Sequence, residues 1–234
     1  MHQWKFTLLV LSTALTIRAA EFTPNGVIEG KSGRIAIDQQ NGFAFQDNGG
    51  TISTFLSAFD PEEKWFSTSN LKEAKRTVDF DRKSVTVTGI YPATGKSPPI
   101  PVEYSLTLLP DGHTARVSID FQADAVQKGF RLYLAFQFGY RDFIKDRHVL
   151  IDGKEINCSF DRTQEKRMGF YGGRAQGCVF NMPEDNSLLK FKLINIDQMD
   201  LAQSWNASAK MHDSFDMSFA FPKDGKLVFD LDLD

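Results

Sequence analysis

A glycine-rich stretch of the sequence places an aromatic ring and a cation close together. In residues 169–174 (GFYGGR), the glycines permit close backbone approach to a ligand, and Tyr171 supplies a ring face that can stack on the apolar face of a sugar. Trp65, Trp205 and Tyr140 also lie in or next to predicted loops, and Arg174 can bind polar groups. These five residues are the candidate ligand-binding residues. Aromatics of this kind also close the ends of a β-sheet core, and that alternative stays open.

The carboxylates offer a second kind of chemistry, because hydrolysis of polysaccharides uses two acids held about 5 to 10 Å apart. The sequence cannot measure such a separation. Asp230, Asp232 and Asp234 alternate, so they share one strand face and could bind a hard cation such as calcium through oxygen ligands. A solvated acidic strand face that discourages edge pairing is the favoured interpretation. We therefore assign no metal ligand and no cofactor, and calcium remains an unplaced possibility.

Other catalytic signatures are missing from the sequence. It contains no Gly-x-Ser-x-Gly nucleophile elbow, and its four histidines are scattered without the close pairing of a zinc site. An enzyme built on this chain would need two convergent acids, or a His or Tyr beside an arginine such as Arg141, Arg162 or Arg174. The catalytic residues are therefore unknown from the sequence.

The only two cysteines, Cys158 and Cys178, flank the glycine-rich stretch. An even number of cysteines in an exported chain favours a disulfide bond, which would close a loop of about 20 residues and contribute about 3 kcal/mol. The alternative is a pair of buried free thiols. The sequence predicts the disulfide.

Residues 1–19 have the features of a secretory leader. Lys5 precedes an uncharged, mostly apolar run over residues 6–17, and Ala19 offers a small residue at a cleavage point before Ala20. The run is too short for a membrane-spanning helix, which needs about 20 residues. We expect residues 1–19 to be a signal peptide and residues 20–234 to form one exported domain, secreted, periplasmic or on the cell surface, without a transmembrane segment.

The charge of the expected mature chain argues against nucleic acid as a partner. The whole sequence has 27 Lys and Arg against 30 Asp and Glu, and loss of Lys5 and Arg18 with the leader moves the formal net charge from −3 to −5. A basic surface that would hold phosphates is therefore not indicated. Neutral partners such as polysaccharides or oligosaccharides remain open, and the oligomeric state is unknown.

The elements that must position these residues are β-strands. Residues 130–138 show the pattern best, because Phe130, Leu132, Leu134, Phe136 and Phe138 share one face of a strand with period two. The same alternation predicts strands at 33–38, 51–59, 84–90, 102–109, 114–121, 188–194, 214–221 and 227–231. Asp-Gly pairs beginning at Asp111, Asp152 and Asp224 predict hairpin turns. Only 60–66 and 197–205 suggest short helical turns.

A dozen or so short strands with frequent turns predict an all-β protein, an antiparallel β-sandwich of jelly-roll or supersandwich type with short loops and little helix. About 215 mature residues are enough to bury a large core, to which the 21 phenylalanines contribute. No internal repeat or low-complexity linker interrupts the chain.

Five segments carry a resemblance to a known family: 130–136 (FRLYLAF), 148–154 (HVLIDGK), 179–183 (VFNMP), 189–193 (LKFKL) and the phenylalanine-rich closing hairpin. Together they resemble the N-terminal β-sandwich modules of large exported bacterial glycoside hydrolases and related polysaccharide-degrading proteins. The likeness spans about a hundred residues, from 130 to 231, and transfers no catalytic residue. It implies a module that works beside glycan-active machinery.

The resulting functional prediction is a non-catalytic, carbohydrate-associated β-sandwich module of an exported protein, which binds or presents glycans for polysaccharide breakdown. The first alternative is a glycan-active enzyme of glycoside hydrolase type on a sandwich scaffold. The second is a structural or adhesive exported domain. Whether the chain is catalytic stays open, since one fold can support any of these functions.

Overall fold

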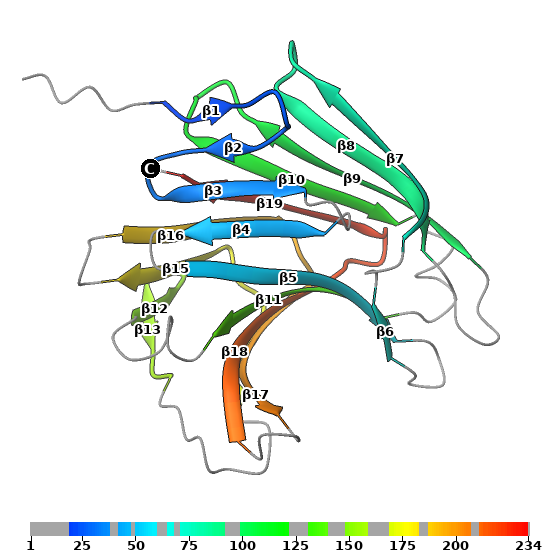
Figure 1. Cartoon of the computed structure of the whole chain (residues 1–234). Coiled ribbons are helices and arrows are strands. Elements are labelled where there is room, and N and C mark those ends of the chain that lie inside the picture. The colour runs from blue at the N-terminus through cyan, green and yellow to red at the C-terminus, as the bar shows by residue number, and fades with distance from the viewer. Residues whose placement is uncertain are drawn as a thin grey trace, which may run out of the picture.

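The computed structural model describes residues 19–37, 42–47, 50–59, 65–67, 71–91, 99–121, 131–139, 148–158, 169–182, 187–206 and 211–233. Over these residues the regular structure consists of strands, arranged in two antiparallel sheets (Figure 1). No helix in these ranges is long and apolar enough to cross a membrane. The predicted all-β, antiparallel sandwich is confirmed.

The first sheet has ten strands in the order β1-β2-β3-β4-β5-β11-β18-β17-β14, with β6 paired to β5. Its strands are β1 (Glu21–Phe22), β2 (Ile28–Glu29), β3 (Gly33–Ile37), β4 (Phe43–Asp47), β5 (Gly50–Phe59), β6 (Trp65–Ser67), β11 (Arg131–Gly139), β14 (Gly169–Gly173), β17 (Gln198–Asn206) and β18 (Met211–Ala220). In Figure 1 the front of the molecule shows β3, β4 and β5 side by side, while β18 and β17 curve away below them.

The second sheet has nine strands in the order β13-β12-β15-β16-β19-β10-β9-β8-β7. Its strands are β7 (Lys72–Asp79), β8 (Ser84–Tyr91), β9 (Ile100–Leu108), β10 (Thr114–Phe121), β12 (His148–Ile151), β13 (Lys154–Ile156), β15 (Gly177–Met182), β16 (Ser187–Asn195) and β19 (Lys226–Asp232). Since β14 ends the first sheet and β15 lies in the second, residues 174–176 carry the chain from one sheet to the other.

The core lies between the sheets, as the alternation of apolar residues predicts. Along β9 the residues Ile100, Val102, Tyr104, Leu106 and Leu108 are all buried. The paired strand β10 buries Ala115, Val117, Ile119 and Phe121 in the same way. Side chains of opposite parity along both strands are exposed or only partly buried, so each strand has one core face and one outer face.

Four phenylalanines join the two sheets. Phe136 and Phe219 belong to the ten-stranded sheet, and Phe191 and Phe229 to the nine-stranded one. The ring centroid of Phe136 lies 5.2 Å from that of Phe191 and 5.7 Å from that of Phe229, mostly edge to face. Phe219 lies 5.4 Å from Phe229. Such pairs add about 0.5 to 1.5 kcal/mol each beyond the area they bury, so this cluster helps to fix how the sheets stack.

The predicted hairpin turns at Asp111 and Asp152 are confirmed, since β9 pairs with β10 and β12 pairs with β13. The hairpin predicted at Asp224 is wrong, because that turn joins β18 of one sheet to β19 of the other and these two strands do not pair. Gly112, Gly153 and Gly225 have φ of 75°, 76° and 76°, the left-handed region that glycine enters without a steric cost. Asp152 also has a positive φ of 48°, which an aspartate tolerates better than most side chains.

The predicted helical turn at 197–205 is wrong. This segment forms β17, in which Met199 and Leu201 are buried while Asp200 between them is not. Its leading Asp197 suggested a helix cap, but the period of two in the following residues outweighs that local signal. Within 60–66, residues 60–64 lie outside the described residues and Trp65 begins strand β6.

Candidate functional site

Tyr171 and Arg174, the two predicted binding residues of the glycine-rich stretch, lie at the edge of the ten-stranded sheet. Tyr171 is partly buried against the core, and its hydroxyl donates a hydrogen bond to the backbone oxygen of Arg174 at 2.7 Å. Partial burial raises the pKa of the Tyr171 phenol, and the nearby Asp152 and Cys178 raise it further. The phenol therefore fixes the start of the loop that follows Gly173. A role of Tyr171 in ligand binding stays a prediction.

Arg174 is exposed on that loop, and its guanidinium lies 3.5 Å from the carboxylate of Asp197 in the turn between β16 and β17. The loop itself is held by Asp152 from the β12–β13 turn. The Asp152 carboxylate accepts hydrogen bonds from the backbone N–H groups of Gln176 and Gly177, both at 2.9 Å. Three turns from two sheets thus meet around Arg174.

The remaining predicted binding residues are not shown to join this group. Trp65 and Trp205 were expected in or next to loops, but their backbones belong to strands, where they pair with Phe59 and His212. Their side chains lie outside the described part of the structure, as does the whole of Tyr140. Within the described residues, the structure brings Tyr171 and Arg174 together.

The predicted disulfide is wrong, because Cys158 and Cys178 are both free thiols. Cys178 lies in β15, and Cys158 follows β13, which is separated from β15 by β12. Burial raises the pKa of the Cys158 thiol to about 12 and raises that of Cys178 as well. Neither thiol is activated as a nucleophile.

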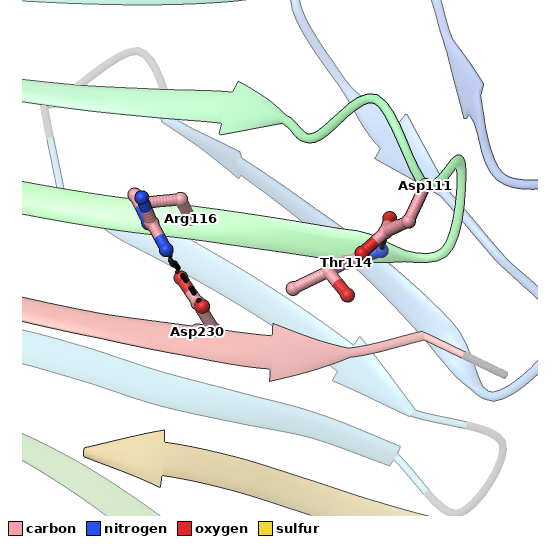
Figure 2. Close-up of polar contacts among 4 residues, drawn as sticks. All are labelled: Asp111, Thr114, Arg116 and Asp230. Atoms are coloured by element: carbon pink, nitrogen blue, oxygen red, sulfur yellow. Dashed lines mark hydrogen bonds and ion pairs between the residues drawn. The ribbon is translucent and has the colours of Figure 1, made fainter. Parts of the chain in front are cut away.

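The acidic residues of the last strand form ion pairs. Asp230 binds the guanidinium of Arg116, and Asp232 binds the ammonium of Lys190 at 2.9 Å (Figure 2 shows the Arg116 pair). Asp234 lies outside the described residues. Among the residues that the structure describes, no three His, Cys, Asp or Glu side chains gather as a metal site. Calcium binding by these aspartates stays a prediction.

A polar surface that the sequence did not single out covers the outer face of β14, β17 and β18. Because Met199, Leu201, Met217 and Phe219 point into the core, the residues between them point outward. We call this surface the aspartate face and define it by Gly172, Gln198, Asp200, Ala202, Asp216 and Ser218. The strand register places Asp200 opposite Ser218 and Gly172, and Asp216 opposite Ala202.

Asp200 is held in place on this face. The side-chain amide of Gln198 donates a hydrogen bond to its Oδ1 atom at 2.8 Å. A Cβ atom added at Gly172 would lie only 3.0 Å from the same Oδ1, so the absence of a side chain at position 172 makes room for the carboxylate. Ala202 is only 3% exposed although strand alternation places it on the outer face, so neighbouring atoms cover it there.

Asp200 and Asp216 are diagonal neighbours on adjacent strands, because Asp200 pairs with Ser218 and Asp216 lies two residues before it. Diagonal neighbours have Cα atoms about 7 to 8 Å apart, which lets two carboxyl groups contact one small ligand from two sides. The signal for this pair was present in residues 198–206, where Gln198, Asp200 and Ala202 alternate with Met199, Leu201 and Gln203. The predicted helical turn concealed it.

Comparison with solved structures shows the same fold. Over 90% of this chain and 96% of the other, it resembles a candidate aldose 1-epimerase from Escherichia coli K12, with 9% identity and a TM-score of 0.52. A galactose mutarotase-like protein from Lactobacillus casei ATCC 334 matches 89% of this chain over 99% of its own, with 9% identity and a TM-score of 0.54. No protein-family model matches the sequence, and no curated protein matches it. At these identities, the likeness establishes the fold alone.

Proposed function

We propose that this chain is a sugar-converting enzyme of the aldose 1-epimerase type, with the aspartate face as its active site. The observation that carries the proposal is the pair Asp200 and Asp216, which lie as diagonal neighbours on one face of β17 and β18. Exchange of the two anomers of a sugar needs a group that accepts the proton of the anomeric hydroxyl and a group that donates a proton to the ring oxygen. Two carboxyl groups on opposite sides of a sugar can take these roles.

In the proposed reaction, one aspartate takes the proton from the hydroxyl on C1 while the other protonates the ring oxygen. The bond from C1 to the ring oxygen breaks, and the free aldehyde forms. Rotation about the C1–C2 bond and reversal of both proton transfers then close the ring with the opposite configuration. No oxidant, metal ion or leaving group is needed. Gln198 and Ser218 supply hydrogen-bonding groups for sugar hydroxyls on the same face.

The extent of the structural likeness supports an enzyme over an appended binding module. Both epimerase-like proteins match this chain over nearly their whole length, so the likeness includes the complete proteins and not one module of a larger enzyme. A non-catalytic module that binds glycans is the second outcome that the experiment must separate. Arg174, whose guanidinium lies 3.5 Å from the carboxylate of Asp197 just before β17, is the predicted binding residue that we expect to contact a sugar on this face.

The test is a measurement of anomer exchange by magnetization-transfer NMR, with the purified chain and a panel of reducing sugars that includes glucose and galactose. Asp200→Asn and Asp216→Asn should each lower kcat/KM by about 100-fold to 10,000-fold. The matched control is Asp120→Asn, which changes a half-exposed aspartate that pairs with Lys226 on the outer face of the other sheet. All variants should keep their Tm within a few degrees of the parent chain.

Two results would contradict the proposal. Full activity in both Asp200→Asn and Asp216→Asn would remove the aspartate face as the active site. Absence of exchange with every sugar would reject the epimerase-type reaction. In that case, retardation of the chain in polysaccharide gels would favour the binding module, and release of new reducing ends would favour a glycoside hydrolase.

A further inference from the structure

Ala20 has the contacts of a core residue. Its backbone N–H donates a hydrogen bond to the carbonyl oxygen of Gly112 at 2.6 Å, and the residue is only 8% exposed. Ala19, directly before it, is exposed. The boundary between a surface residue and a core residue thus falls between two alanines.

The β9–β10 turn that receives Ala20 also holds the other end of the chain. Within the turn, Gly112 N–H donates to the carbonyl oxygen of Leu109 at 3.0 Å, and Asp111 accepts hydrogen bonds from the N–H groups of His113 and Thr114, both at 2.9 Å. The N–H of Leu233 donates to the carbonyl oxygen of His113 at 3.0 Å. This turn is therefore a fixed platform, and Ala20 docks on it.

We propose that a leader peptidase hydrolyses the peptide bond between Ala19 and Ala20, and that the new amino terminus of Ala20 becomes part of the fold by docking on Gly112. Water adds across the bond, leaving a carboxylate on Ala19 and an ammonium group on Ala20. The ammonium keeps a proton donor where the amide N–H had one. Hydrogen bonds from a charged donor are shorter and stronger than neutral ones, so processing preserves the contact.

The structure distinguishes cleavage after Ala19 from cleavage after Ala20. Cleavage after Ala20 would remove a buried side chain and the hydrogen bond to Gly112, whereas cleavage after Ala19 removes only an exposed residue. The leader pattern agrees, because Ala19 is a small residue at the last leader position and a cut after Ala20 would place Arg18 in an unfavourable position. This inference concerns the export of the chain and does not depend on the proposed catalytic activity.

The first experiment exports the full chain from a bacterial host and determines the mass of the intact product. A product that begins at Ala20 is expected, and Ala19→Leu should abolish it because the last leader position must be small. The control replaces residues 1–19 by a leader that the host is known to process. With that control processed normally, an uncut native chain or a product that begins at Glu21 overturns the proposal.

The second experiment tests the docking. Purified chains that begin at Ala20 and at Glu21 are compared by thermal unfolding, and Ala20→Gly separates the amino group from the methyl group. We expect the chain that begins at Glu21 to unfold about 2 to 4 °C lower, with Ala20→Gly between the two. Equal Tm values for the chains that begin at Ala20 and Glu21 would overturn the docking.

Discussion

The guanidinium of Arg116 and the carboxylate of Asp230 form a two-point ion pair across β10 and β19. Arg116 Nε lies 2.7 Å from Asp230 Oδ1, and Arg116 Nη2 lies 2.9 Å from Asp230 Oδ2 (Figure 2). The carboxylate side chain is 8% exposed and the guanidinium side chain is 41% exposed. This hydrogen bond raises the pKa of Arg116, although burial opposes the rise.

Because the two side chains differ in exposure, replacing Arg116 and replacing Asp230 should destabilise the fold by different amounts. Arg116→Met removes the ion-pair partner of a buried carboxylate, and it should lower the free energy of unfolding by about 2 kcal/mol. Asp230→Asn leaves a guanidinium that water can reach, so its cost should be about 1 kcal/mol or less. Urea unfolding at neutral pH measures both variants. A larger loss of unfolding free energy in Asp230→Asn than in Arg116→Met would show that burial of the carboxylate does not decide the effect.

Asp111 predicts a pH dependence of stability. Burial alone would raise its pKa, but hydrogen bonds from the backbone of His113 and from Thr114 hold it below its usual value. A lowered folded pKa stabilises the fold above the unfolded pKa of about 3.9, and that contribution is lost as pH falls through the folded pKa. Because Asp111 is exposed, the effect should be below about 1 kcal/mol.

The measurement is urea unfolding of the parent chain and Asp111→Asn at pH 7, 5 and 3. The parent chain should be more stable at pH 7 and 5, and the difference should shrink at pH 3. Asp81→Asn, in the exposed β7–β8 turn, is the control. A difference that grows as the pH falls would refute this account of Asp111.

Arg76 joins the edge of one sheet to the other sheet. Its Nη1 and Nη2 atoms donate hydrogen bonds to the carbonyl oxygens of Ile37 at 2.8 Å and Asn25 at 2.7 Å. A lysine ammonium lacks the planar fork that reaches both oxygens, so Arg76→Lys should lower the free energy of unfolding by about 1 to 2 kcal/mol. It should also increase the rate of backbone hydrogen exchange in β2 and β3. The exposed neighbour Lys75 provides the control Lys75→Met, which should leave both quantities unchanged.

The two free thiols predict slow reaction with alkylating reagents. With a pKa of about 12, Cys158 is a thiolate in roughly one molecule in ten thousand at pH 8, and Cys178 is more deeply buried. Unreduced protein should take up two alkyl groups when unfolded and react far more slowly when folded, with Cys178 the slower. Mass spectrometry counts the groups. If unfolded, unreduced protein takes up no alkyl group, the two cysteines form a disulfide, which would contradict the structure.

Two glycines of β14 form a matched pair that tests the aspartate face. Gly172→Ala would place a Cβ 3.0 Å from the carboxylate of Asp200 and displace it, whereas a Cβ at Gly169 meets no atom within 4 Å. We expect Gly172→Ala to lower sugar turnover at least tenfold with little change in Tm, and Gly169→Ala to leave turnover unchanged. Equal activity in the two variants would show that the position of Asp200 does not matter.

Strand periodicity and turn residues make much of the fold predictable from the sequence alone. The alternation around Leu134 and Phe136 and the Asp-Gly pair at Asp111 act through neighbouring residues, so local order reveals them. The same local signals misplaced β17, because Asp197 predicts a helix cap although the residues after it alternate as in a strand. They also missed β4, although Phe43 and Phe45 alternate there as Ile35 and Ile37 do in β3.

Only the tertiary structure decided which residues share a site. Asp200 and Asp216 are sixteen positions apart in the sequence, and they become neighbours because β17 pairs with β18 in one register; a shift by one residue would turn one of them into the core. The same holds for Arg116 and Asp230, which the fold joins across β10 and β19. Distances between segments depend on strand order and register, and these are set by the packing of the whole core.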